Sequence, residues 1–203
     1  MKKYRQAILL FTGFQQSDEK RSGFEDGFFN HIARLQDENT LIYAPRTWKT
    51  NVQELANQLR RQGVERVAML SYSHGQAAAV EFAEYCYEIG IAVDLWLACD
   101  PVARATWLPR QTWAQIFAWR ALLKKGIIKV PSNIARTVYI RQEYDMPRGH
   151  TLVPKSESQV VELAGILHTF GHCEIDESFY WWSLVTKELP TWINPPKAIL
   201  ITE

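Results

Sequence analysis

One serine lies in a short segment whose residue types suit a nucleophile. Residues 71–75 read Ser-Tyr-Ser-His-Gly, between an apolar run at 66–70 and an alanine-rich run at 76–89. This order predicts a strand, a tight turn and a helix, with Ser73 at the centre of the turn. Such a turn lifts the serine hydroxyl above the sheet, and the backbone N–H of His74 at the helix start can stabilise an oxyanion.

The residues that flank Ser73 are small, as a close crossing of a strand and a helix requires. Ser71, Gly75 and Ala77 meet this requirement, although Ser71 stands where the Gly-x-Ser-x-Gly pattern has its first glycine. A serine-rich turn that only caps a helix is the alternative interpretation, because small-x-Ser-x-Gly is frequent by chance. The strand predicted before the turn and the helix predicted after it favour the nucleophile.

The rest of the chain supplies the elements that must position this turn, since apolar runs alternate with amphipathic stretches along it. Strands are predicted at 7–11, 41–44, 66–70, 93–98 and 136–140, and helices at 23–35, 51–61, 76–89 and 176–189. This alternation predicts an α/β fold, a three-layer sandwich in which a mainly parallel central sheet has helices on both faces. We expect a single domain over residues 1–203, with an excursion at about 103–133 that could form a cap.

The strand, the turn around Ser73 and the helix that follows resemble the α/β-hydrolase fold, in particular its small lipase, esterase and cutinase-like members. The resemblance covers roughly residues 7–189. It implies a serine nucleophile, an acid and a histidine in that order along the chain. Ser73 takes the first of these roles.

Two carboxylates are candidates for the acid. Asp100 lies at the carboxyl end of the strand predicted at 93–98, where an open α/β sheet gathers its functional groups. Its strand-Asp-Pro sequence is similar to the acid site of pancreatic-type lipases, although it could instead cap the turn made by Pro101. Asp145 is the alternative, but it lies several residues beyond the strand at 136–140. Asp100 is therefore preferred.

Five histidines are candidates for the base. His172 lies in the loop before the last predicted helix, which is the usual place for the base in this fold, and it is preferred. His168 is the alternative base, and His150 is the least favoured of the three later histidines. His31 precedes the acid in an amphipathic helix and is assigned a structural role, whereas His74 is expected to act through its backbone.

The oxyanion hole needs a second donor besides the N–H of His74. The loop after the first strand contains Gly13 and Phe14, which resemble the Gly-Phe pair at this place in lipases. The resemblance assigns the second N–H to Phe14, with Gln15 as the neighbouring candidate. A plain glycine turn between a strand and a helix is the alternative interpretation of this loop.

Composition and charge exclude several classes of protein. The 203 residues are 47% hydrophobic, and 23 Lys and Arg against 22 Asp and Glu leave a net charge of +1. These values are typical of a globular chain and predict no nucleic-acid partner. Three cysteines make no disulfide framework, and the short apolar run at 7–11 is interpreted as a core strand rather than a signal sequence. We therefore expect a soluble, cytoplasmic protein.

The stretch between Asp100 and Glu143 contains no acidic residue. Its basic residues are interleaved with aromatic ones: Arg104, Arg110, Arg120, Lys124, Lys125, Lys129, Arg136 and Arg141 with Trp107, Trp113, Phe117 and Trp119. As a cap, this stretch would suit a substrate with an acyl or aromatic part and an anionic part, and it would also suit contact with an anionic membrane surface. We favour a helix that packs on its own domain with its lysines in solvent.

No cofactor or metal is predicted, because the chain has no Walker loop, no Gly-x-Gly-x-x-Gly after a strand and no CxxC or HExxH ligand pair.

The resemblance implies a hydrolase of small-molecule carboxylic esters, with Ser73, Asp100 and His172 as its triad. A thioesterase or amidase would use the same three groups. The alternative from another class is a catalytically silent binding protein on the same scaffold. The oligomeric state is not predicted.

Overall fold

The computed structural model describes residues 4–13, 29–43, 46–102, 126–145 and 147–195. Most of the excursion predicted at 103–133, including its tryptophans, lies outside these ranges. So do Phe14 and Gln15, the candidates for the second oxyanion donor. None of the helices in the described ranges is both long and apolar enough to cross a membrane.

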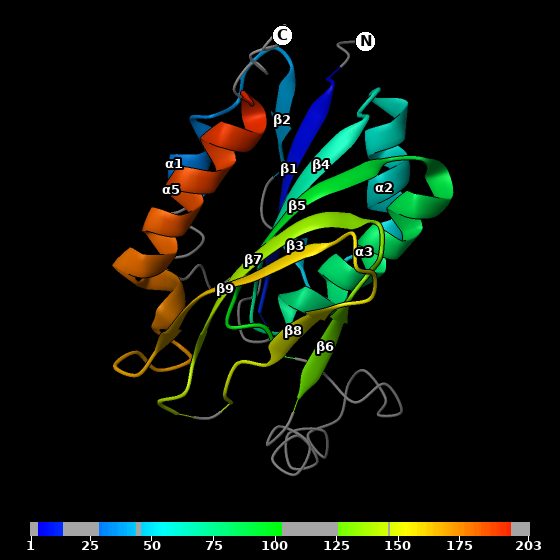
Figure 1. The fold of residues 1–203 in the computed structure, drawn as a ribbon. Coiled ribbons are helices and arrows are strands. Elements are labelled where there is room, and N and C mark those ends of the chain that lie inside the picture. The colour runs from blue at the N-terminus through cyan, green and yellow to red at the C-terminus, as the bar shows by residue number, and fades with distance from the viewer. Residues whose placement is uncertain (1–3, 14–28, 44–45, 103–125, 146, 196–203) are drawn as a thin grey trace, which may run out of the picture.

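A central parallel sheet organises the described chain (Figure 1). Its strands are β1 (Gln6–Thr12), β2 (Thr40–Ile42), β3 (Arg46–Thr47), β4 (Arg66–Tyr72), β5 (Ala92–Cys99), β7 (Ile134–Gln142) and β9 (Val160–Leu167). They lie in the order β2-β1-β4-β5-β7-β9, with β3 also paired to β1. Every pairing in this sheet is parallel, so the carboxyl ends of β4, β5, β7 and β9 lie at one edge.

Helices cover both faces of the sheet (Figure 1). On one face lie α2 (Val52–Arg61) and α3 (Gly75–Ile89), and on the other lie α1 (Phe29–Ala33) and α5 (Phe179–Ile193), the last preceded by the short η3 (Ile175–Glu177). These layers confirm the predicted α/β fold. Two more strands, β6 (Ile127–Val130) and β8 (Thr151–Pro154), form a separate two-stranded parallel sheet.

The two hydrophobic cores explain why the central strands have continuous apolar sequences. In β1, Leu9 and Phe11 pack in the core beneath α2 and α3, whereas Ile8 and Leu10 pack in the core beneath α5. Every residue of β1 is buried. A parallel strand covered on both faces has no solvent side, and its sequence therefore lacks the usual polar alternation.

Four strands were not predicted, namely β3, β6, β8 and β9. The omission of β9 has a physical cause, because it is the edge strand beside β7 and most of its residues are exposed or half-buried. The last helix also differs from the prediction, since it begins at Phe179 and continues past Pro190. The buried side chains of Trp192 and Ile193 hold this last turn against the core.

Candidate active site

Ser73 occupies a sharp turn between β4 and α3. Its φ angle is +52°, a left-handed conformation that non-glycine residues seldom adopt. The turn is held in place because the Ser73 N–H donates to the carbonyl of Cys99 at 3.0 Å, and the Ser73 carbonyl accepts from the N–H of Val102 at 3.1 Å. Ser73 is only 5% exposed, and a Cβ added at Gly13 would lie 3.0 Å from the Cβ of Ser73.

The helix after this turn starts very close to the neighbouring strand. A Cβ added at Gly75 would lie 2.2 Å from the carbonyl oxygen of Phe11 in β1, so only glycine fits there without a backbone shift. This contact explains the small residue in the last position of the motif. It sets the distance between the α3 N-terminus and the sheet.

Ser71, which departs from the Gly-x-Ser-x-Gly pattern, has a structural partner. Its hydroxyl accepts a hydrogen bond from Nε1 of Trp96 at 2.9 Å, and both residues are buried. A glycine at this position would leave the indole N–H without that acceptor. The departure is therefore matched by a tryptophan on β5.

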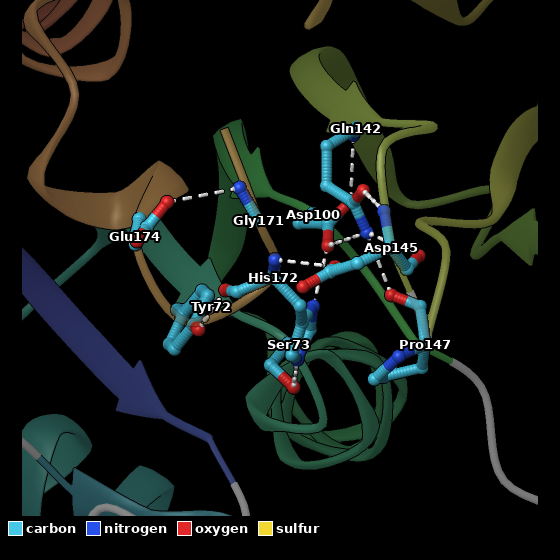
Figure 2. A network of polar contacts seen from close by, with 9 residues as sticks. All are labelled: Tyr72, Ser73, Asp100, Gln142, Asp145, Pro147, Gly171, His172 and Glu174. Atoms are coloured by element: carbon cyan, nitrogen blue, oxygen red, sulfur yellow. Dashed lines mark hydrogen bonds and ion pairs between the residues drawn. The ribbon is translucent and has the colours of Figure 1, made fainter. Parts of the chain in front are cut away.

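His172 lies in the loop between β9 and η3, and its ring reaches Ser73 (Figure 2). The Nε2 atom is 2.7 Å from Ser73 Oγ, and the Nδ1 atom is 2.5 Å from Asp100 Oδ2. A carboxylate beside Nδ1 favours the tautomer with its proton there, which leaves Nε2 as an acceptor for the serine hydroxyl. The structure thus brings the three predicted residues into one hydrogen-bonded chain.

Asp100 follows the last residue of β5 and is fully buried, with a φ angle of +44°. Its Oδ1 accepts from the backbone N–H of Gln142 at 2.9 Å, and its Oδ2 also accepts from Gln142 Nε2 at 3.3 Å. A Cβ on Gly149 would lie 2.0 Å from Oδ1, so a glycine is needed beside the carboxylate. These bonds orient the buried carboxylate toward the imidazole of His172.

The alternative acid, Asp145, contacts the same histidine at a different atom. Its Oδ1 accepts from the backbone N–H of His172 at 2.8 Å, whereas Asp100 is the carboxylate at the ring (Figure 2). The alternative base, His168, is exposed just after the end of β9. Among the predicted candidates, the structure therefore places His172 and Asp100 beside Ser73.

The three remaining histidines contact residues other than the Ser73 hydroxyl. His150 is buried beside Gly126, and burial lowers the pKa of its imidazole. His31 is half-buried, with its ring centroid 5.9 Å from that of Trp182. His74 is buried at the start of α3, where its Nδ1 lies 3.4 Å from the Val102 carbonyl.

Sequence reasoning missed two residues that touch this site. Tyr72 stacks on the His172 ring, with centroids 5.4 Å apart and planes at 25°, and its hydroxyl donates to the His172 carbonyl. Burial and, to a smaller extent, Asp176 raise the pKa of the Tyr72 phenol, which keeps this donor protonated. Gln142 binds Asp100 through both its backbone and its side chain. The signal that could have found Gln142 is a polar residue at the end of a buried strand next to β5. No signal in the sequence indicated that Tyr72 contacts His172.

No protein-family model matches the chain, and no curated protein matches it. The functional assignment of the chain consequently depends on its fold and on the geometry of this site.

Proposed function

We propose that the chain is a serine hydrolase of the α/β-hydrolase type that cleaves carboxylic esters through an acyl-enzyme. One observation carries this proposal, namely the continuous hydrogen-bonded chain from Ser73 Oγ through the His172 imidazole to Asp100. The three residues follow β4, β5 and β9, so they converge at the carboxyl edge of the parallel sheet. This edge is where open α/β sheets bind their ligands.

The proposed reaction has two halves. Ser73 Oγ attacks the acyl carbon of the ester while His172 Nε2 takes the hydroxyl proton, and a tetrahedral oxyanion forms. This intermediate collapses with cleavage of the carbon–oxygen bond, and His172 returns the proton to the departing alcohol. A water molecule, deprotonated by His172, then attacks the acyl carbon; the bond from that carbon to Ser73 Oγ breaks, His172 returns the proton to Ser73 Oγ, and the acid is released. Asp100 stabilises the imidazolium that forms in each half.

The developing oxyanion needs donors that are already oriented. The backbone N–H of His74, at the start of α3, is the first proposed donor, and the helix N-terminus adds a favourable potential there. Phe14, the second proposed donor, lies outside the described residues. Gly13, which precedes Phe14 in the sequence, lies beside the nucleophile, since a Cβ added there would be 3.0 Å from Ser73 Cβ.

Backbone strain also supports a functional site at this edge of the sheet. In the part of the chain that the structure describes, the non-glycine residues with positive φ are Ser73 and Asp100. Such conformations cost about 1–3 kcal/mol each and persist where the surrounding structure enforces them. Both lie in the proposed triad, as is typical of functional sites, where strained conformations cluster.

The decisive measurement is labelling by a fluorophosphonate probe, in which Ser73 Oγ bonds to phosphorus and fluoride leaves. We expect the wild-type protein to be labelled and Ser73→Ala to be unlabelled, with hydrolysis of a p-nitrophenyl ester lost in parallel. Ser158→Ala, a change at an exposed serine, is the matched control and should behave as wild type. Folded wild-type protein that resists the probe would favour the silent binding protein.

The type of bond cleaved is tested by the same variants. A thioester or an amide would use the same three groups, since each reaction passes through a serine acyl-enzyme. A matched set of ester, thioester and amide substrates with one acyl group would rank the three activities. The proposal expects the ester to have the highest kcat/KM.

We also propose a reducing compartment such as the cytoplasm. Cys86, Cys99 and Cys173 are free thiols, two of them buried and the third exposed. Free thiols are typical of proteins kept in a reducing environment.

A further inference from the structure

The backbone of His172 is held at both of its polar atoms by side chains from elsewhere in the chain. Asp145 accepts from its N–H at 2.8 Å, and the Tyr72 hydroxyl donates to its carbonyl. We infer that Asp145 and Tyr72 are positioning residues that hold the backbone of His172 on both sides of its Cα, so that the imidazole stays aligned with Ser73. This inference rests on the proposed function.

The location of His172 explains why such support is needed. The residue lies in the loop between the edge strand β9 and η3, and loops move more than the elements they join. The bond from Nδ1 to Asp100 restrains the ring but leaves the peptide free to shift and tilt. Hydrogen bonds at the N–H and the carbonyl fix the two peptide planes on either side of the His172 Cα, and stacking on the Tyr72 ring limits tilting of the imidazole.

Asp145 is itself anchored to the acid of the triad. Gln142 Oε1 accepts from the Asp145 N–H at 2.9 Å, while Gln142 Nε2 donates to the carbonyls of Asp145 at 3.2 Å and Pro147 at 2.7 Å. The backbone N–H of the same glutamine binds Asp100 Oδ1. Gln142 thus links the carboxylate at the ring to the carboxylate at the peptide (Figure 2).

A glycine makes room for the Asp145 carboxylate. A Cβ added at Gly171 would lie 2.7 Å from Asp145 Oδ2, so a larger residue before His172 would push the carboxylate away from the peptide. The Gly171 N–H in turn donates to Glu174 Oε2 at 3.2 Å, and this bond joins the residue before His172 to a residue after it. The loop is therefore held on both sides of the base.

The test compares Asp145→Ala and Tyr72→Phe with the wild type in ester hydrolysis and in the rate of fluorophosphonate labelling. We expect kcat to fall about 10- to 100-fold in each, because a small displacement of the base misaligns the proton transfer. KM should stay within about twofold, since neither residue is assigned a contact with substrate. Asp145→Asn keeps an oxygen that can accept from the His172 N–H, and it should recover most of the rate.

Asp37→Ala is the matched control for loss of a loop carboxylate. Asp37 accepts from the backbone N–H groups of Asn39 and Thr40 at 2.7 and 2.6 Å, at the opposite end of the sheet order. The Asp37→Ala variant should have a lower melting temperature than the wild type and an unchanged kcat. Should Asp145→Ala not fold, Tyr72→Phe decides the matter, because it keeps the stacked ring and removes only the hydroxyl.

The outcomes separate this inference from the proposed function. Wild-type rates of hydrolysis and labelling in folded Asp145→Ala and Tyr72→Phe would overturn the positioning roles and leave the hydrolase standing. Failure of the wild type to react with the probe would remove both. The double variant Tyr72→Phe/Asp145→Ala should lose less than the product of the two single effects, since both act through the backbone of one residue, His172.

Discussion

Ser71 illustrates how a single residue departs from a motif without altering the turn around the nucleophile. The position must be small because β4 and α3 cross closely, and serine satisfies this limit almost as well as glycine. Its hydroxyl also serves as the acceptor for the buried indole N–H of Trp96. The departure therefore belongs to the packing of β4 on β5 and takes no part in the proposed reaction.

The change Ser71→Ala tests this role directly. It keeps the residue small and leaves the Trp96 N–H buried without its acceptor, so the free energy of unfolding should fall by about 1–3 kcal/mol. The kcat of ester hydrolysis should change little. Urea denaturation and ester kinetics check the two expectations, and a large loss of kcat with unchanged stability would give Ser71 a role in the reaction instead.

At the scale of elements, the start of α3 sets the geometry of the nucleophile. The helix meets β1 through Gly75, beneath which the Phe11 carbonyl leaves no space for a side chain. Ser73 lies two residues before this contact. A shift of the helix away from β1 would therefore move the hydroxyl relative to His172.

Gly75→Ala should lower both stability and activity. The added Cβ would force the backbone of α3 or β1 to shift, with a cost of about 1–3 kcal/mol in the free energy of unfolding. Gly165→Ala is the matched control, because a Cβ at Gly165 in β9 meets no atom within 4 Å. Thermal denaturation and the labelling rate should separate the two variants; equal behaviour would mean that the close approach does not constrain the turn.

At the scale of the whole molecule, an ion network joins the helical layer to the sheet. Arg136 on β7 binds Glu188 on α5 and, at 3.2 Å, Glu162 on β9. The Glu188 side chain is only 7% exposed, and its hydrogen bond with Arg136 lowers the pKa of its carboxyl below the ordinary value of 4.5. The pair helps to hold α5 over β7 and β9.

This lowered pKa predicts a loss of stability in acid. Because the folded pKa of Glu188 is below the unfolded one, its contribution is complete above about pH 4.5 and is lost as the pH falls through the folded value. Urea denaturation between pH 7 and pH 3 should show a shallower fall for Glu188→Gln than for wild type. The exposed pair of Glu54 with Arg61 supplies the control Glu54→Gln, and parallel curves for Glu188→Gln and wild type would refute the prediction.

Four of the predicted strands are buried on both faces. The strands β1, β4, β5 and β7 have apolar runs because helices cover both sides of the sheet, and such runs are visible in the sequence. The edge strand β9 has a weaker pattern because most of its residues are exposed or half-buried, and β6 and β8 are only four residues long. The predicted last helix ended at 189, just before Pro190. In the structure α5 continues past this proline to Ile193, where Trp192 is buried.

The local pattern of the sequence was enough to place Ser73 between a buried strand and a helix. It was also enough to place Asp100 at the end of a strand. Both features depend only on neighbouring residues. Only the tertiary structure decided which carboxylate meets the ring of His172, since these groups are 72 residues apart and the alternative, Asp145, also lies beside that histidine. The reason is the register of adjacent parallel strands together with the bonds of Gln142, which direct Asp100 to the imidazole and Asp145 to the peptide.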